Sequence, residues 1–332
     1  MKRISQRDIA RQLGVNVSTV SRALRGLDGV SAELKTQIEQ LAEAGGYRPN
    51  PFAMSLRFGT TRTIGIVVPD VSFNQYAHIV KSVEAEARKS GYMSIITNSN
   101  DRYDNEADCL ELLVNMHVEG IIICLSQETT TFAHLERLCR MKMPVVLFDR
   151  AVDIGISSVI INDAASAREA TNCLIESGAR RIAFLGGSNQ LQQTVDRKHG
   201  YLEALREHGI KICTELVKCH PISFNSGLSD TMELLRLPEP PDAILAMDDT
   251  LTIAALQAAK SLGRRIPEDL SIIGYTSEQL SAVSSPSLTF LRRNAKEIGH
   301  EAFRLLIEWM EGNEEVRNVK VNVRLEVKES TI

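Results

Sequence analysis

The side chains best suited to contact another molecule lie in the segment DIARQLGVNVSTVSRAL, residues 8–24. If a helix over residues 17–25 buries Val20, Ala23 and Leu24, its periodicity leaves a polar face on the other side. That polar face comprises Ser18, Ser21, Arg22 and Arg25. Short hydroxyls let a helix sit deep in the major groove of DNA, and a guanidinium can donate two hydrogen bonds to guanine. The spacing therefore predicts a DNA-contacting helix with Arg22 as its main base contact.

Several polar residues of this segment have other roles open to them. Asn16 can be a plain N-cap of the helix, and Arg25 fits a solvated charge better than a base contact. Thr19, Ser21 and the region of Ser5 suit phosphate contacts, which position a protein on DNA without selecting a sequence.

The basic residues are concentrated at the N-terminal end of the chain. Residues 1–62 contain ten Lys and Arg but five Asp and Glu, a net charge of +5, whereas the whole chain carries −4. A basic segment on an acidic body favours a polyanionic partner at one end. A solvated basic surface would look the same, so the charge supports the DNA-binding prediction without deciding it.

The composition is that of a globular protein of two or three domains, with 332 residues, 43% hydrophobic and 24% charged. The start, MKRISQRDIA, lacks the apolar run of a signal peptide, and no later run approaches the length of a membrane span. We therefore expect a cytoplasmic protein with no membrane contact. The six cysteines contain no C-x-x-C pair, which favours inert reduced thiols, and we expect neither a metal site nor a cofactor.

The first part of the chain predicts three short helices, whose candidate N-caps are Ser5, Asn16 and Ser31. Gly14 and the pair Gly45-Gly46 are candidate helix ends. We expect a helical headpiece over residues 1–47. Residues 48–62, with two prolines and a polar run, suit a linker that contains a short helical patch.

From residue 63 onward, strands and helices alternate. Apolar runs such as TIGIVVP, GIIICL and PVVLFD, and later RIAFLGG, DAILAMD and LSIIGY, are typical of buried parallel strands. Two successive series of comparable size predict an α/β core of two doubly wound parallel sheets, preceded by an all-α headpiece. Ligands in such folds bind at the carboxyl ends of the strands, so we expect a pocket between the lobes.

These motifs together resemble the LacI/GalR family of bacterial transcription regulators, named after the lactose repressor. The resemblance rests on DIARQLGVNVSTVSRAL, YRPNPFAMSL, TIGIVVPDVS, FDR, DRKHGYLEAL, MDDTLTIAAL and RRIPEDLSIIGY, in the order and spacing of the family. It implies a helix-turn-helix headpiece, a hinge helix and a dimeric core like that of periplasmic binding proteins. The implied core, residues 63–332, has an N-lobe of about 63–160 and 291–318 and a C-lobe of about 161–290 and 319–332.

The resemblance also assigns roles in DNA binding. Asn16, Val17 and Ser18 would point at base edges, with Val17 against a thymine methyl group. In the hinge, Asn50-Pro51 would begin a helix, and paired hinge helices would insert Leu56 between base steps in the minor groove. Packing of Leu56 within the dimer is the alternative.

The resemblance places an effector between the lobes. The implied ligand-binding residues are Tyr76, Asp149, Arg197, Asp248 and Thr276. Asp248 could instead cap the next helix, and Arg197 could form an ion pair between the lobes. Acidic side chains and an arginine at strand ends suit hydrogen bonding to a polyol, which favours a sugar or sugar derivative.

The sequence departs from the family pattern near this site. Thr276 stands where the family has an aspartate, and Arg292 and Arg293 follow in LTFLRRN. If these arginines reach the cleft, a phosphorylated or carboxylated effector fits as well as a neutral sugar. If they face outward, they suit an interface.

We therefore predict a homodimeric repressor of transcription that binds a pseudo-palindromic operator in double-stranded DNA and responds to a small-molecule effector. A same-family regulator controlled by a protein partner or a phosphorylated metabolite is the first alternative, and a solute-binding protein is the second. An enzyme is not expected, because FLGGSNQ lacks the spacing of a phosphate-binding loop and no nucleophile or metal set is present.

Overall fold

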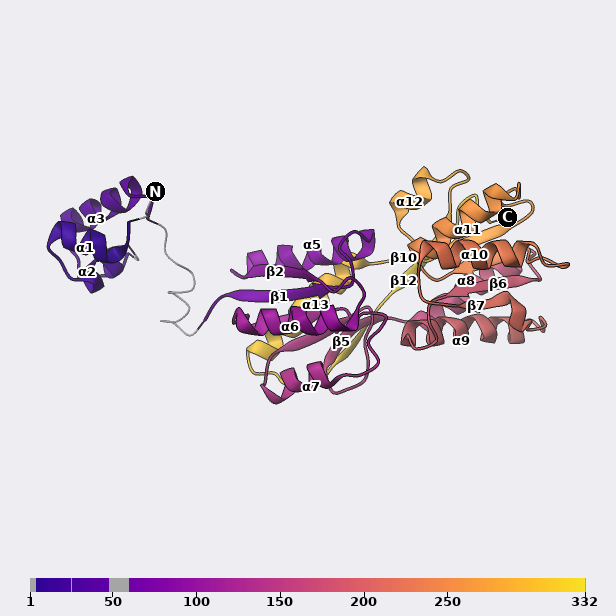
Figure 1. The fold of residues 1–332 in the computed structure, drawn as a ribbon, viewed down its shortest axis with the longest axis horizontal. Helices are drawn as coiled ribbons and strands as arrows, with labels where there is room; N and C mark the ends of the chain where they lie inside the picture. Colours follow the sequence, from indigo (N-terminus) through magenta and orange to yellow (C-terminus); the bar gives the residue numbers. More distant parts are fainter. Residues whose placement is uncertain (1–3, 25, 48–59, 332) are drawn as a thin grey trace. The chain divides into compact units, whose positions relative to one another are not determined.

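The chain divides into two compact units, Met1–Thr61 and Arg62–Ile332 (Figure 1). The structure, a computed structural model, describes residues 4–24, 26–47 and 60–331. The predicted hinge residues Asn50 and Leu56, and the predicted surface residue Arg25, lie outside these described residues.

The first unit contains the helices α1 (Gln6–Leu13), α2 (Val17–Ala23) and α3 (Ala32–Ala44). Ser5 caps α1 as expected, because its hydroxyl accepts from the backbone N–H of Asp8 while the Asp8 carboxylate accepts from the backbone N–H of Ser5. Ser31 caps α3 through the N–H of Leu34. Gly14 ends α1 at φ 65°, a left-handed conformation that favours glycine.

The core of this unit agrees with the predicted buried face of α2 but not with its predicted polar face. Val20 and Ala23 are buried against Ile9 and Ile38, as predicted. Ser21, however, is only 6% exposed and does not belong to the polar surface. The reason is that α2 packs against both α1 and α3, so its buried side is wider than one apolar stripe.

The N-cap of α2 also differs from the expectation. Asn16 occupies the N-cap position with extended backbone, but its side chain makes no capping hydrogen bond. Only its carbonyl takes part, accepting from the N–H groups of Thr19 and Val20. The Asn16 amide is therefore exposed rather than used to hold the helix.

The N-lobe of the second unit is built on a six-stranded sheet of order β11-β5-β4-β3-β1-β2, in which every pair of neighbours is parallel. Its strands are β1 (Thr63–Val68), β2 (Met93–Asn98), β3 (Gly120–Ile123), β4 (Val145–Phe148), β5 (Ser157–Ile161) and β11 (Asn318–Val321). Its helices are α5 (Asn74–Lys89), α6 (Tyr103–Asn115), α7 (Ala133–Arg140) and α13 (Ala295–Met310). Successive residues of β1 face opposite sides, so Ile66 packs with α5 and α13 and Val67 packs with α6 and α7.

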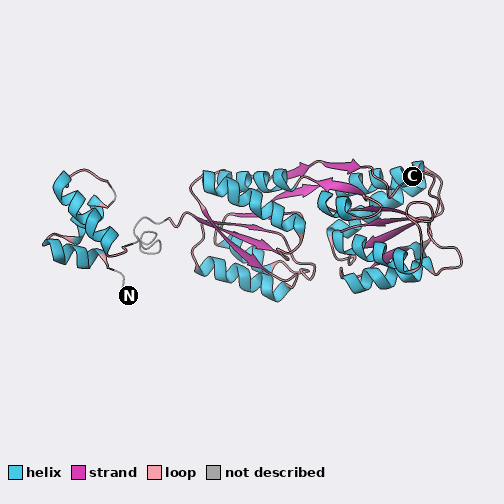
Figure 2. Ribbon diagram, turned by 90° about the horizontal axis from the view of Figure 1, so that it is seen from above, coloured by secondary structure: helices cyan, strands magenta, loops and turns pink. Residues whose placement is uncertain are grey.

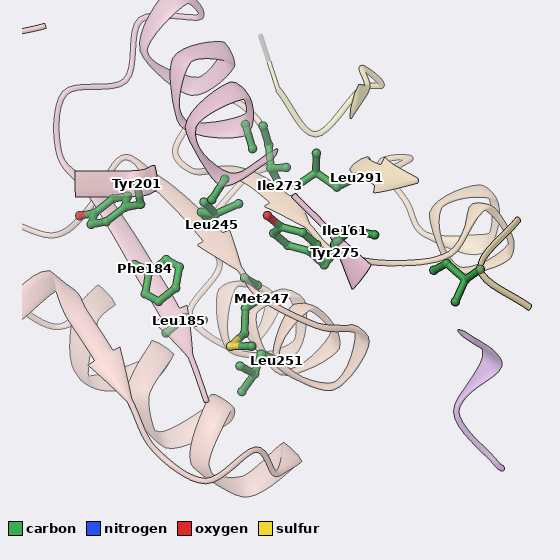
Figure 3. Close-up of a cluster of buried hydrophobic side chains, with 14 of the residues drawn as sticks. Ile161, Phe184, Leu185, Tyr201, Leu245, Met247, Leu251, Ile273, Tyr275 and Leu291 are labelled. Carbon is green, nitrogen blue, oxygen red and sulfur yellow. The ribbon is translucent and has the colours of Figure 1, made fainter. Parts of the chain in front are cut away.

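The C-lobe is built on a second six-stranded sheet, of order β12-β10-β9-β8-β6-β7, whose neighbours are parallel except for the antiparallel pair β10 and β12. In both lobes helices cover the sheet (Figure 2). Its strands are β6 (Ile182–Gly186), β7 (Val217–Cys219), β8 (Ala243–Ala246), β9 (Ser271–Gly274), β10 (Thr289–Arg293) and β12 (Val323–Glu326). Its helices are α8 (Asp163–Glu176), α9 (Gln192–Glu207), η1 (Thr214–Leu216), α10 (Phe224–Leu235), α11 (Asp249–Ser261) and α12 (Glu278–Val283). Phe184, Leu245 and Tyr275 form part of its core (Figure 3).

The chain passes between the lobes three times: after β5, after β10, and between β11 and β12. The last two crossings follow Arg293 and Val321, a few residues beyond the boundaries near 290 and 318 expected above. Because of these crossings, β10 and β12 of the C-lobe sheet continue directly into N-lobe elements (Figure 1). The cleft between the lobes is thus bordered by segments that are far apart in the sequence.

Within the described residues, none of the helices is long and apolar enough to span a bilayer. In the same residues, no three His, Cys, Asp or Glu side chains are grouped so as to hold a metal ion.

Candidate functional site

The first unit presents a polar surface at the start of α2. Asn16, Val17, Ser18 and Arg22 are exposed, and Val17 is 41% exposed although it is apolar. Thr19 is half-buried. These positions lie at the N-terminal end of the second helix of a helix-turn-helix, the end that contacts base edges when such a helix enters the major groove.

Ser5 is exposed, but its hydroxyl already has a partner. The Ser5 Oγ donates to Asp8 Oδ2 at 2.6 Å and accepts from the Asp8 backbone N–H at 3.2 Å. A phosphate contact by this hydroxyl would have to compete with the capping box.

Asp149 is the centre of the hydrogen bonds in the cleft between the lobes. It follows β4 directly and has φ 57°, the left-handed region that costs a non-glycine residue about 1–2 kcal/mol. Gln75 Nε2 donates to its Oδ1 at 2.9 Å, and Tyr76 Oη donates to its Oδ2 at 3.2 Å. The aromatic ring of Tyr76 is buried at the edge of Phe148. Tyr76 therefore supports Asp149 in addition to lining the cavity.

Arg197 projects from α9 and is only 1% exposed. Its Nε donates to Asp163 Oδ1 at 2.5 Å, its Nη1 donates to the carbonyl of Met247, and its guanidinium lies 3.8 Å from the centre of the Tyr275 ring. Nη2 has no hydrogen-bond partner in the described part of the chain. A buried donor without a partner is costly, so this atom is suited to an acceptor on a ligand.

Asp248 combines the two roles that the sequence left open. Its Oδ1 accepts from the N–H of Leu251 at 2.8 Å and so caps α11, while the residue also lines the cavity beside Arg197. Burial raises the pKa of Asp248 to about 6, against the opposing effect of that N–H. Burial likewise raises the pKa of Asp163 to about 6, although Arg197 favours its charged form.

The cavity formed by these residues is small, about 60 Å³, which is far below the roughly 300–1,000 Å³ of typical ligand sites. It adjoins a pocket of about 490 Å³, and both are lined by Asp149, Arg150 and Gln193. In this arrangement the polar side chains bind one another and leave room for a few water molecules. The adjoining pocket has the volume that a small ligand needs.

Hydrogen bonds join the two lobes across the cleft. Gln193 of α9 donates to the carbonyl of Asp149 at 3.2 Å, and the N–H of Ile222 donates to Gln127 Oε1 at 3.1 Å. Arg293 Nη1 lies 3.9 Å from Asp149 Oδ1. A ligand that engages Asp149 would change the contacts that hold the lobes together.

The residues that depart from the family pattern, Thr276, Arg292 and Arg293, lie in different surroundings. Arg293 lines the cavity, as one interpretation expected, but Arg292 points away and pairs with Glu278 and Glu326. Thr276 does not line the cavity itself; its hydroxyl donates to Asp249, which does, and Thr276 lies on the adjoining groove. Of the predicted ligand residues, Thr276 is the one set back from the cavity that Tyr76, Asp149, Arg197 and Asp248 line.

The cleft residues that were not singled out in the sequence include Gln75, Asp163 and Gln193. Signals along the chain could have found two of them. Asp163 follows the end of β5 by two residues, as Asp248 follows β8, and Gln193 precedes Arg197 by four residues on one helix face.

Comparison with known proteins decides the family. Residues 6–50 match bacterial regulatory proteins of the lacI family, and residues 171–331 match a periplasmic binding protein-like domain. The HTH-type transcriptional repressor CytR of Escherichia coli (strain K12) is 30% identical over 308 residues, 93% of this chain and 90% of the relative. The chain belongs to the lacI family of bacterial regulatory proteins. Catabolite control protein A of Priestia megaterium is 31% identical over 331 residues, 98% of each chain.

Solved structures of regulators share the fold of this lacI-family chain. A transcriptional regulator CelR–cellobiose complex has a TM-score of 0.75 and 28% identity, covering 99% of this chain and all of the other. A lac repressor dimer bound to operator and the anti-inducer ONPF has a TM-score of 0.88 over 100% of both chains. At 23% identity, that second match concerns the fold alone.

The family membership confirms the resemblance seen in the sequence and the predicted fold, an α/β core behind an N-terminal helix-turn-helix. It also confirms that this lacI-family protein is a DNA-binding regulator of transcription and not an enzyme.

Proposed function

We propose that this regulator is a repressor that binds a pseudo-palindromic operator as a homodimer, and that a small effector in the interlobe cleft changes its operator affinity. The proposal includes the division into a headpiece of residues 1–47, a hinge of 48–62 and a core of 63–332. It also includes the cytoplasm as the place of action, since the operators lie there.

The observation that carries the DNA-binding part is the exposed face at the start of α2. Asn16, Val17 and Ser18 would contact base edges, and Arg22 would donate two hydrogen bonds to a guanine. Thr19 and Ser5 would contact phosphates. The burial of Ser21 removes it from the proposed interface.

The hinge part of the proposal rests on sequence, because Asn50 and Leu56 lie outside the described residues. Asn50 would begin the hinge helix, and Leu56 would insert into the minor groove opposite its dimer mate. Unstacking base pairs costs a few kcal/mol, which the additional contacts of bent DNA would offset.

The DNA-binding part is tested by Arg22→Ala. Fluorescence anisotropy with a palindromic duplex from DNA upstream of a regulated gene should show an affinity loss of about 1–3 kcal/mol, roughly 5- to 150-fold. Arg206→Ala is the matched control, because it removes an exposed arginine on α9, outside the headpiece. The operator affinity of this variant should be unchanged. Equal affinity of the native protein for operator and unrelated DNA would refute the proposal.

The effector part is supported by the chemistry of the cleft. Asp149 and Asp248 present acceptors, and Phe73 and Tyr76 present ring surfaces. Arg197 presents a buried donor that no residue described by the structure satisfies. Donors and acceptors beside an aromatic surface suit a polyol, and we propose a sugar or sugar derivative.

One observation favours a second candidate, an effector that carries a phosphate or carboxylate. Arg293 lines the cavity, and its separation of 3.9 Å from Asp149 is longer than a hydrogen bond. An anionic group could take the place of Asp149 beside this guanidinium.

A thermal-shift screen of sugars, sugar phosphates and nucleosides separates these candidates. A ligand of the cleft should raise the melting temperature of the native protein and should not raise that of Arg197→Ala. Its effect on Arg206→Ala should equal its effect on the native protein. A hit that still stabilises Arg197→Ala to the same extent would place the ligand elsewhere.

A further inference from the structure

A second concave site lies beside the strands that connect the lobes. It is a groove of about 740 Å³ bounded by α5 of the N-lobe, by α12, β10 and β12 of the C-lobe, and by the first turn of α13. These five elements are labelled in Figure 1. Its volume is in the range of small-molecule sites. The groove adjoins the cleft at Gln75, Asp249 and Arg293 but does not contain Asp149, Arg197 or Asp248.

The groove is basic although the core is acidic. Residues 63–332 carry a net charge of −9. The basic side chains that line the groove are Lys81, Lys89, Arg292, Arg293, Lys296 and Arg324. Four acidic side chains line it as well, and each is engaged locally. Glu86 and Glu278 form ion pairs with Lys89 and Arg292, whereas Asp249 and Glu297 accept hydrogen bonds from Thr276 and Asn294. The excess of positive charge points to an anionic ligand.

Three of these basic side chains have no partner among the described residues. Lys81, Lys296 and Arg324 form no ion pair or side-chain hydrogen bond with any residue that the structure describes. The first two are brought near each other by a contact between helices, because Ser82 Oγ donates to the carbonyl of Lys296 at 2.7 Å. One wall of the groove therefore carries two ammonium groups that are unpaired within the described part of the chain.

The opposite wall carries an unfavourable pair. Arg292 of β10 and Arg324 of β12 are directly opposed in the antiparallel ladder, so their side chains leave the sheet on the same face. Like charges at this position repel each other. Glu278 at 2.7 Å and Glu326 at 3.2 Å neutralise Arg292, whereas Arg324 forms no such ion pair with residues 4–24, 26–47 or 60–331. An anion placed against Arg324 would relieve the repulsion.

We propose that this groove binds a small phosphorylated metabolite, with a phosphate held by Arg324, Lys81 and Lys296. Lys81 belongs to the N-lobe and Arg324 to the C-lobe, so the ligand would contact both lobes beside their connecting strands. Binding would favour one angle between the lobes and would act in addition to an effector in the cleft.

Isothermal titration calorimetry of the full chain with pyrophosphate, at ionic strength matched with sodium chloride, tests the site. Saturable binding is expected, with inorganic phosphate binding more weakly. Lys81→Ala combined with Arg324→Ala should lower the affinity about tenfold or more, because charge-assisted bonds to phosphate are lost. Lys260→Ala combined with Arg206→Ala removes the same charges at exposed positions outside the groove and should leave the affinity unchanged.

Lys296→Gln is a milder third variant, which should weaken binding in the same direction if the double variant proves unstable. The proposal is overturned if pyrophosphate shows no saturable binding at matched ionic strength. It is also overturned if Arg197→Ala abolishes the binding while the Lys81 and Arg324 variant retains it, because the anion would then lie in the cleft.

Discussion

Asp149 determines how the cleft is closed in this structure. Its left-handed backbone is maintained by an N–H donated to the carbonyl of Val159 and by side-chain bonds from Gln75 and Tyr76. Strained conformations of this kind are found where function requires a fixed side-chain position. Because Gln193 and Arg293 of the other lobe also approach it, one residue connects the ligand cavity to the angle between the lobes.

The raised pKa of Asp248 leads to a prediction about pH. The Asp248 carboxyl has a pKa of about 6 in the folded protein and a pKa near 4 in the unfolded chain. Between pH 4 and 6 it therefore keeps its proton in the folded state and releases it in the unfolded state. The contribution of Asp248 to the free energy of unfolding therefore falls as the pH rises from about 4 to 6. Above pH 6 the charged carboxylate opposes folding. Asp248→Asn should raise the free energy of unfolding at pH 7 by about 1 kcal/mol, since Asn keeps the cap and removes the charge.

Thermal melts of native protein and variant between pH 4.5 and 8 measure this effect. The increase in the free energy of unfolding caused by Asp248→Asn should shrink as the pH falls toward 4.5. Asp108→Asn, at an exposed position of α6, is the control and should give no comparable increase. A gain that is the same at both ends of the range would show that charge is not the cause.

At the scale of elements, the crossing of α8 and α9 positions two buried side chains at the interlobe cleft. Gly200 of α9 lies against α8 so closely that a Cβ would be 2.0 Å from the carbonyl oxygen of Ala164. The neighbouring turns supply Asp163 on α8 and Arg197 on α9, which form the buried ion pair. The absence of a side chain at residue 200 thus determines how closely these two groups approach.

Gly200→Ala should separate α8 from α9 and destabilise the core by about 1–3 kcal/mol, the usual cost of overpacking. It should also weaken binding of a cleft ligand, because the Arg197–Asp163 pair moves. Urea unfolding and the thermal-shift response measure the two effects. Arg206→Ala on the same helix should leave both unchanged, and native-like stability of Gly200→Ala would show that the crossing is not tight.

At the scale of the whole molecule, exposed apolar residues mark a surface that a second copy could cover. β2 is an edge strand of the N-lobe sheet, yet Met93 is 71% exposed and Ile96 is 43% exposed. In the C-lobe, Val283 at the end of α12 is 80% exposed. Natural proteins protect apolar edge strands, and association of two chains is one means.

Met93→Glu combined with Ile96→Lys should therefore shift the proposed dimer toward monomer, because charges would be buried at the contact. Sedimentation velocity measures the mass, and operator binding should weaken in parallel. Met141→Glu changes an apolar residue of similar exposure near α7 and is the matched control. A variant that stays dimeric would remove β2 from the interface.

The sequence by itself determined what depends on neighbours along the chain. Caps at Ser5 and Ser31, the left-handed Gly14 and the continuous apolar strands follow from local hydrogen bonding, backbone sterics and periodicity. The positions of Asp149 and Asp248 after buried strands indicated the cleft, because the carboxyl ends of parallel strands lie at one edge of a sheet.

Only the tertiary structure decided which side chains meet. Ser21 is buried because α2 contacts two helices, and Arg293 enters the cavity while Arg292 turns to Glu278 because adjacent strand residues face opposite sides. Gln193 reaches Asp149 because three crossings bring the lobes together. Such contacts depend on the angle between elements far apart in the chain, and local patterns carry no information about that angle.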